Sequence, residues 1–209
     1  DADPKLKEQT CVTCRRNRDI IKRNFDFEGV DLTSLLDDED RRHADAMIDG
    51  HGPANYLDLS LDGVQIGRYA LYEFLLNEKK KSLSLSDDDW KRFVPYLRNA
   101  LLAFFAAKKV FEREKIDRLI CYNAYYAVNH IFCEIAQRQG VPSYSLHAGE
   151  NLSNRLTTLS VSRELTYPNR NADVNWLRYR ELPSSKSNVT AVSEHFLSLF
   201  EGLNVFAYS

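Results

Sequence analysis

One stretch, Ile116–Asn151, constrains the fold most, because it has the pattern of a strand, a crossover helix and a second strand. Its first apolar run, 119–122, is short and continuous, as in a strand that is covered on both faces. A segment with apolar residues near a 3.6-residue period follows, and Gly140 and Pro142 are typical of its C-terminal end. A second apolar run, 141–146, completes the pattern. The sequence therefore predicts one parallel βαβ unit.

Polar residues follow both predicted strands at the point where each strand ends. Asn123 comes directly after the first strand, and His147-Ala148-Gly149-Glu150-Asn151 comes after the second. In open parallel sheets, ligands bind at the carboxyl ends of the strands, where loops and helix N-termini converge. Asn123 and residues 147–151 are therefore the first candidates for a functional site.

The composition indicates a folded domain without an obvious nucleic-acid or lipid partner. The 209 residues are 44% hydrophobic, which is enough for one substantial core. Lys and Arg number 28 against 30 Asp and Glu, so no basic surplus points to nucleic acid. No apolar run approaches the roughly 20 residues of a membrane-spanning helix, and the polar first ten residues do not resemble a signal peptide. We expect a cytoplasmic protein, with peripheral association at the inner face of the membrane left open.

Helical periodicity covers much of the remaining chain. Ser86 is followed by three aspartates, which is typical of a helix N-cap with acids that complement the helix dipole. This cap begins the longest predicted helix, about 87–115, whose aromatic and aliphatic stripe is interpreted as a core face. A last amphipathic helix is predicted at about 189–200.

The expected fold class is α/β, with a Rossmann-like three-layer domain that has a parallel sheet and many helices. Residues 1–202 would form this domain, and residues 203–209 would begin a second domain or add a closing strand. The sequence has no initiator Met, and Met47 is its only methionine. We therefore interpret the chain as a piece of a longer protein.

The four cysteines are interpreted as structural thiols. Cys11 and Cys14 have the spacing of half a zinc knuckle or of a redox pair, but no second half is found in the sequence. Cys121 and Cys133 fall in the predicted strand and helix, where a small apolar thiol is an ordinary core residue. His130, three residues before Cys133, is interpreted in the same way as a core or helix-surface residue. No metal site is assigned to any of them.

The order of these features resembles the N-terminal domain of a GT-B type glycosyltransferase, of the kind found in bacterial capsule and surface-polysaccharide biosynthesis. The segments that carry the resemblance span most of the chain: Cys11/Cys14, Asp62-Gly63-x-x-Ile66-Gly67 before a helix, Arg118–Asn123, the Gly140-Val-Pro strand that ends in His147-x-Gly149-Glu150, and the run Phe200–Ser209. In such enzymes two Rossmann-like domains face each other across a cleft. The first mainly holds the acceptor, and the second mainly holds the nucleotide-sugar donor.

The resemblance implies transfer of a sugar from a nucleotide-sugar donor to a glycan or lipid-linked acceptor, with a donor-binding domain downstream and no cofactor. Half of the cleft alone would show little turnover. An inverting transfer needs a base that accepts the proton of the acceptor hydroxyl. His147 or Glu150 suits this role, and His147 is slightly favoured because an imidazole titrates near neutral pH without help.

The other candidate site residues would bind substrate. Asn123, Gly149 and Asn151 would shape the pocket through hydrogen bonds and close backbone approach. Gly67 would permit a second close approach, and Arg68 would meet a phosphate or carboxylate of the acceptor. No Asp-x-Asp motif ends a predicted strand, so a metal-independent reaction is expected.

Two alternatives fit the same pattern of residues. One is a non-catalytic Rossmann-like module that binds a carbohydrate or nucleotide, and the other is a nucleotide-sugar epimerase. A dehydrogenase is disfavoured because no Gly-x-Gly-x-x-Gly motif follows a strand. Sequence downstream of Ser209 would discriminate among them, since either enzyme should continue with a second βαβ domain that carries a Gly-rich loop.

Overall fold

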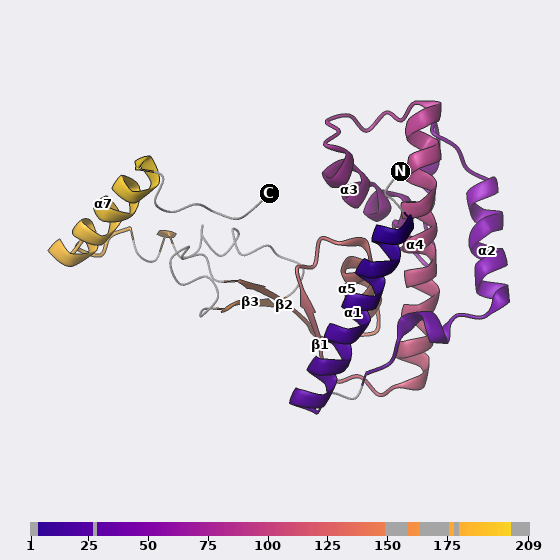
Figure 1. Cartoon of the computed structure of the whole chain (residues 1–209), viewed down its shortest axis with the longest axis horizontal. Helices are drawn as coiled ribbons and strands as arrows, with labels where there is room; N and C mark the ends of the chain where they lie inside the picture. Colours follow the sequence, from indigo (N-terminus) through magenta and orange to yellow (C-terminus); the bar gives the residue numbers. More distant parts are fainter. Residues whose placement is uncertain (1–3, 27–28, 149–158, 164–175, 178–179, 202–209) are drawn as a thin grey trace.

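The computed structural model describes residues 4–26, 29–148, 159–163, 176–177 and 180–201. Within these ranges the chain is mostly helical, with a small sheet at one side of a group of packed helices (Figure 1). The helices and strands in chain order are α1 (Pro4–Phe25), the 3-10 helix η1 (Leu32–Leu35), α2 (Asp38–Asp49), the 3-10 helix η2 (Tyr56–Asp58), α3 (Ile66–Glu78), α4 (Asp87–Arg113), β1 (Leu119–Tyr122), α5 (Ala127–Arg138), β2 (Ser143–Ala148), β3 (Leu159–Arg163) and α7 (Lys186–Phe200).

The predicted Rossmann-like three-layer domain with a parallel sheet is wrong. The described strands form a three-stranded mixed sheet in the order β1-β2-β3, in which β2 pairs parallel with β1 and antiparallel with β3. A Rossmann-like sheet needs a series of parallel strands with helices on both faces. Here most apolar residues before β1 lie on helix faces at a 3.6-residue period, so the main core is built from helices packed on helices.

The βαβ unit itself is confirmed. Leu119 to Tyr122 of β1 pair in parallel with Ser143 to Leu146 of β2, and α5 connects the two strands. Gly140 has a φ of 71°, a left-handed conformation that glycine adopts without steric cost after a helix. The strand–helix–strand pattern is therefore correct, but β1 is not covered on both faces as the sequence predicts, because Ile120 is 61% and Tyr122 is 54% exposed. The wrong step is to extend one such unit to a whole parallel sheet.

The core is built around α4. Its N-terminus is a capping box, because Ser86 Oγ accepts a hydrogen bond from the Asp89 N–H at 3.2 Å and the Asp89 carboxylate accepts one from the Ser86 N–H at 3.3 Å. Phe93, Leu97 and Leu101 follow at helical spacing and are completely buried. The helix packs against α2, α3 and α5. The predicted N-cap and the predicted core face of this helix are both confirmed.

Helix α3 begins in direct contact with η2. The N–H of Gly67 donates to the carbonyl oxygen of Leu59 at 3.1 Å. A Cβ atom at Gly67 would lie 1.8 Å from the carbonyl oxygen of Tyr56, which is far inside van der Waals contact. Glycine at this position therefore allows the backbones of α3 and η2 to meet, and this packing accounts for the close approach that the sequence predicts there.

The predicted domain boundary and the question of a membrane-spanning helix are addressed only within the described residues. The predicted boundary after Gly202, and residues 203–209 with it, lie outside the described residues. Among the helices described, none has both the length and the apolar character that crossing a membrane requires.

We predict that Gly67→Ala lowers the free energy of unfolding by about 3 kcal/mol, because the added Cβ must displace the Tyr56 backbone from α3. Urea denaturation followed by circular dichroism measures the change. The matched control is Gly52→Ala, where the added Cβ would meet no atom within 4 Å. Equal stability of the two variants would contradict this account of the contact between α3 and η2.

Candidate functional site

The carboxyl ends of β1 and β2 bring Asn123 and His147 to the same edge of the sheet. The Asn123 N–H donates to the carbonyl oxygen of Leu146 at 3.0 Å, which joins the residue after β1 to β2. The rings of Tyr122 and His147 are nearly parallel, at 8°, with centroids 5.9 Å apart. The structure thus places Asn123 and His147 at neighbouring strand ends. The ring of Tyr122, the last residue of β1, is stacked on the ring of His147.

The loop after β1 is fixed by its own asparagines. Asn123 has a φ of 51°, in the left-handed region that asparagine tolerates better than most residues. Its Oδ1 accepts a hydrogen bond from the Tyr125 N–H at 3.3 Å. Asn129 Nδ2 donates to the carbonyl oxygens of Tyr122, at 2.5 Å, and Asn123, at 3.0 Å. The edge of the sheet is therefore held in shape by hydrogen bonds within the protein.

A carboxylate of the protein occupies the N-terminus of α5. Glu73, on α3, accepts a hydrogen bond from the Ala127 N–H at 2.8 Å. The N-terminus of a helix favours negative charge, and here Glu73 supplies it. A phosphate at the same place would meet this carboxylate at close range. The edge is therefore better suited to an uncharged polar ligand than to a diphosphate.

Tyrosine rings border the same loop. Tyr72 on α3 lies with its ring centroid 5.8 Å from that of Tyr125 and 6.4 Å from that of Tyr126. Tyr72 and Tyr126 are each 40% exposed, and Tyr122 is 54% exposed. Aromatic rings that face solvent this openly beside hydrogen-bonding groups provide both apolar faces and polar hydroxyl groups for a ligand.

His130 lies beneath the loop that carries Asn123, in a partly buried position that agrees with its interpretation as a core or helix-surface residue. Its Nδ1 lies 3.0 Å from the carbonyl oxygen of Ala124, in the loop that carries Asn123. Because a carbonyl oxygen can only accept, Nδ1 carries the proton and Nε2 has the lone pair. Burial lowers the pKa of His130 below its ordinary value, so the ring is neutral at neutral pH. The sequence shows only a single histidine in a predicted helix. The proton position on the ring follows from the position of the Ala124 carbonyl in the folded protein.

A tyrosine on α3 completes the surroundings of His130. The ring centroid of Tyr69 lies 3.9 Å from that of His130. Burial, together with the charge of Glu134 on α5, raises the pKa of Tyr69 to about 12. Tyr69 is therefore a neutral hydrogen-bonding group at any physiological pH. Through its ring contact with His130 it links α3 to α5.

The structure does not bring the other predicted site residues to the edge that carries Asn123 and His147. Arg68 lies exposed on the first turn of α3, where its Nη1 is 3.4 Å from Gln65 Oε1. Gly67 contacts η2, and this packing explains why the position needs a glycine. Ligand binding at Gly67 stays a prediction. Gly149, Glu150 and Asn151 lie outside the described residues.

The interpretation as structural thiols is confirmed for Cys121 and Cys133 but not for Cys11 and Cys14, which are exposed. Cys121 and Cys133 are buried between β1 and α5, and the neighbouring Cys121 thiol and burial raise the pKa of Cys133. Cys11 and Cys14 are exposed on α1. In the part of the chain that the structure describes, no three His, Cys, Asp or Glu side chains gather in a way that could hold a metal ion.

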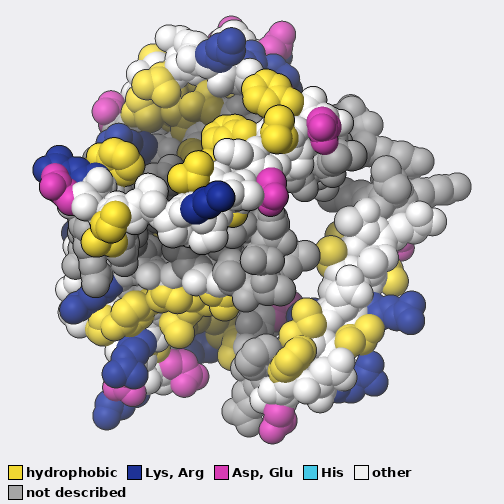
Figure 2. All heavy atoms as spheres, turned by 90° about the vertical axis from the view of Figure 1, so that its left-hand side faces the viewer, with side chains coloured by type: hydrophobic (Ala, Val, Ile, Leu, Met, Phe, Trp, Pro, Cys, Tyr) yellow, Lys and Arg dark blue, Asp and Glu magenta, His cyan; other side chains and the backbone are white. Residues whose placement is uncertain are grey.

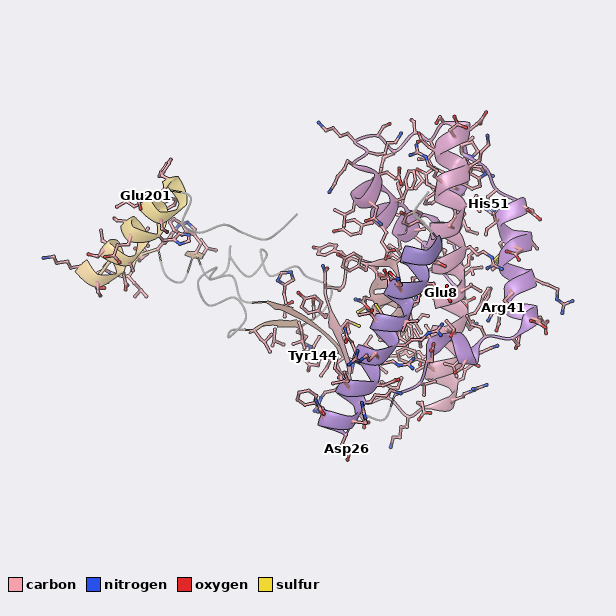
Figure 3. All side chains as sticks on the ribbon, in the orientation of Figure 1. Glu8, Asp26, Arg41, His51, Tyr144 and Glu201 are labelled. Carbon is pink, nitrogen blue, oxygen red and sulfur yellow. The ribbon has the colours of Figure 1, made fainter. Side chains whose placement is uncertain are left out.

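A separate pocket of about 270 Å³ lies between α2 and α4, with Phe104 and Phe105 among its lining residues. Its lysines already have partners: Lys108 pairs with Asp62 at 2.8 Å, and Lys109 pairs with carboxylates of the α2 N-terminus. Figure 3 labels Tyr144 on the sheet and His51 just after the end of α2, and the two lie on opposite sides of α4. The lining of this pocket includes no residue of the edge that carries Asn123 and His147, so the two are distinct, and both lysines of the pocket are paired with carboxylates.

The chain matches no protein-family model, no curated protein and no solved structure. The geometry of the edge described above is therefore the basis for assigning a function.

We predict that stability falls with pH below about 6.5, where the unfolded His130 side chain begins to bind a proton that the folded protein resists. The sign follows from the lowered pKa, because the unfolded state binds more protons in this range and is favoured as pH falls. His130→Gln keeps a donor for the Ala124 carbonyl and removes the titration, so its stability should fall less over the same range. Urea titrations between pH 5 and pH 8 compare the two slopes, and identical slopes would contradict the assignment.

Proposed function

We propose that the chain binds a sugar at the edge formed by the ends of β1 and β2, and that it takes part in sugar transfer from a nucleotide-sugar donor to a glycan or lipid-linked acceptor. The observation that carries the proposal is the parallel stack of Tyr122 and His147 beside Asn123. Aromatic faces pack against the apolar C–H faces of sugar rings, because their negative quadrupole attracts the partly positive hydrogens. Amide and imidazole groups hydrogen-bond sugar hydroxyls in both directions.

The charges at this edge favour the acceptor sugar over the donor diphosphate. Glu73 already neutralises the N-terminus of α5, and its carboxylate would repel a phosphate there. A neutral sugar meets no such repulsion and gains the exposed tyrosine rings of the loop. The diphosphate would then bind to other residues, in keeping with a two-sided site of the kind that sugar transfer requires.

His147 is the proposed general base. It would accept the proton of an acceptor hydroxyl while the oxygen attacks the anomeric carbon and the nucleoside diphosphate leaves. Its position at the end of β2, with its ring stacked on Tyr122, restricts the orientation of the imidazole. Glu150, three residues further along the chain, is the alternative base.

We predict that the full protein transfers or hydrolyses a nucleotide-sugar from a donor panel, and that His147→Ala lowers kcat by about 10²- to 10⁴-fold, as loss of a general base does. Release of nucleoside diphosphate measures the rate. Glu150→Ala, tested in parallel, identifies the base, because only loss of the true base produces this decrease.

The matched control is His51→Ala, which removes a histidine from the end of α2, far from the sheet (Figure 3). It should leave the rate unchanged. Turnover that survives both His147→Ala and Glu150→Ala would contradict the proposed base. Sugar binding that depends on Tyr122 and Asn123, without turnover of any donor, would instead support a non-catalytic carbohydrate-binding module.

A further inference from the structure

One face of the sheet, which we call the open sheet face, carries exposed apolar side chains, and none of the described helices packs on it. Residues paired across neighbouring strands point to the same side, so the strand register defines which side chains share this face. Two rows cross it: Ile120, Tyr144 and Arg163, and then Tyr122, Leu146 and Val161. Ile120 is 61% exposed and Val161 is 57% exposed, which is unusual for apolar residues in the middle of strands. Figure 2 shows one side of the molecule, on which hydrophobic side chains gather in several groups.

The opposite face of the same sheet is covered. Cys121, Ser145 and Ser162 form the row between the two just described, and they are 8%, 8% and 3% exposed. Helix α5 packs on β1 and β2 from this side. The parallel pair of β1 and β2 is of the kind that is normally covered on both faces, and among the described elements no layer covers the open sheet face. Three strands about 4.8 Å apart present a surface about 10 Å wide, which is the diameter of one helix.

Helix α7 has an apolar stripe that matches the open sheet face in chemical character and in size. Val189, Val192, Phe196 and Phe200 follow one another at intervals of three and four residues, so they lie on one side of the helix. Their exposed fractions run from 54% to 88%. Figure 1 shows α7 set apart from the sheet. Since the stripe and the open sheet face are exposed at the same time, neither covers the other within one chain.

We propose that two copies of this chain associate by exchanging helices, with the α7 stripe of each copy packed on the open sheet face of the other. Each copy has one stripe and one such face, so a two-fold axis forms both contacts at once and leaves neither of these two surfaces open to a third copy. The formal charge of −2 per chain opposes the approach of two copies only weakly. Tyr122 belongs to the open sheet face and stacks on His147, so the docked helix of the second copy borders the candidate sugar site.

Light scattering of the 209-residue chain over a range of concentrations measures the mass, and a species of twice the 24.2 kDa of one chain is expected. Val161→Asp and Phe196→Asp each place a charge in the contact and should each yield monomers. Both side chains are exposed in the single chain, so both variants should fold. Ser187→Asp, on the side of α7 opposite the stripe, is the matched control and should leave the dimer intact. A wild-type monomer at all concentrations, or a dimer that resists both substitutions, would overturn the proposal.

Cross-linking distinguishes exchange between copies from docking of α7 on its own sheet. In a background with Cys11→Ser and Cys14→Ser, chains with Val161→Cys are mixed with chains with Phe196→Cys and exposed to a mild oxidant such as oxidised glutathione. A disulfide-linked heterodimer is the expected product. If the mixture gives none, and a single chain with both substitutions closes its own disulfide as a monomer, then α7 covers its own sheet and the exchange does not occur.

Discussion

The structure depends on one helix, α4, and on the requirement that its apolar stripe be buried. Phe93, Leu97 and Leu101 are completely buried, and no single neighbouring helix is wide enough to cover a stripe that continues to Phe111. Helices α2, α3 and α5 therefore surround α4 and share its surface. Burial of large apolar side chains is the main favourable term in folding, so the positions of these helices follow from this one constraint. The capping box at Ser86 sets where the helix begins and hence which side chains form the stripe.

The candidate site inherits its rigidity from this arrangement. Because α3 and α5 both pack on α4, Glu73 and Tyr69 of α3 are held against the first turns of α5 and the loop before it. That loop carries Asn123, whose backbone is tied to β2. The edge with Asn123 and His147 is thus supported by helices that belong to the main core, although it lies on a small sheet. A site with this support is already in place before a ligand arrives, which lowers the entropy cost of binding.

Several features could be predicted from the sequence because they depend on residues close together in the chain. The βαβ unit, the N-cap at Ser86, the long helix after it and the last amphipathic helix all rest on short-range periodicity and capping. The meeting of Asn123 and His147 follows from the parallel pairing of two strands. By contrast, the size of the sheet depends on which further strands pair with it. The three-layer domain was therefore a wrong prediction, since β3 adds to the sheet in the antiparallel direction.

The sequence by itself determined the local elements, the buried face of α4 and the polar residues at the ends of the strands, because helix and strand periods are set by backbone geometry. Only the tertiary structure decided what those elements meet. It placed His130 against the carbonyl of Ala124 and gave Gly67 its role against Tyr56. It also set Glu73 at the N-terminus of α5. These contacts join residues that different elements contribute, and their energies depend on burial and on distances through space, which no local pattern of residues encodes.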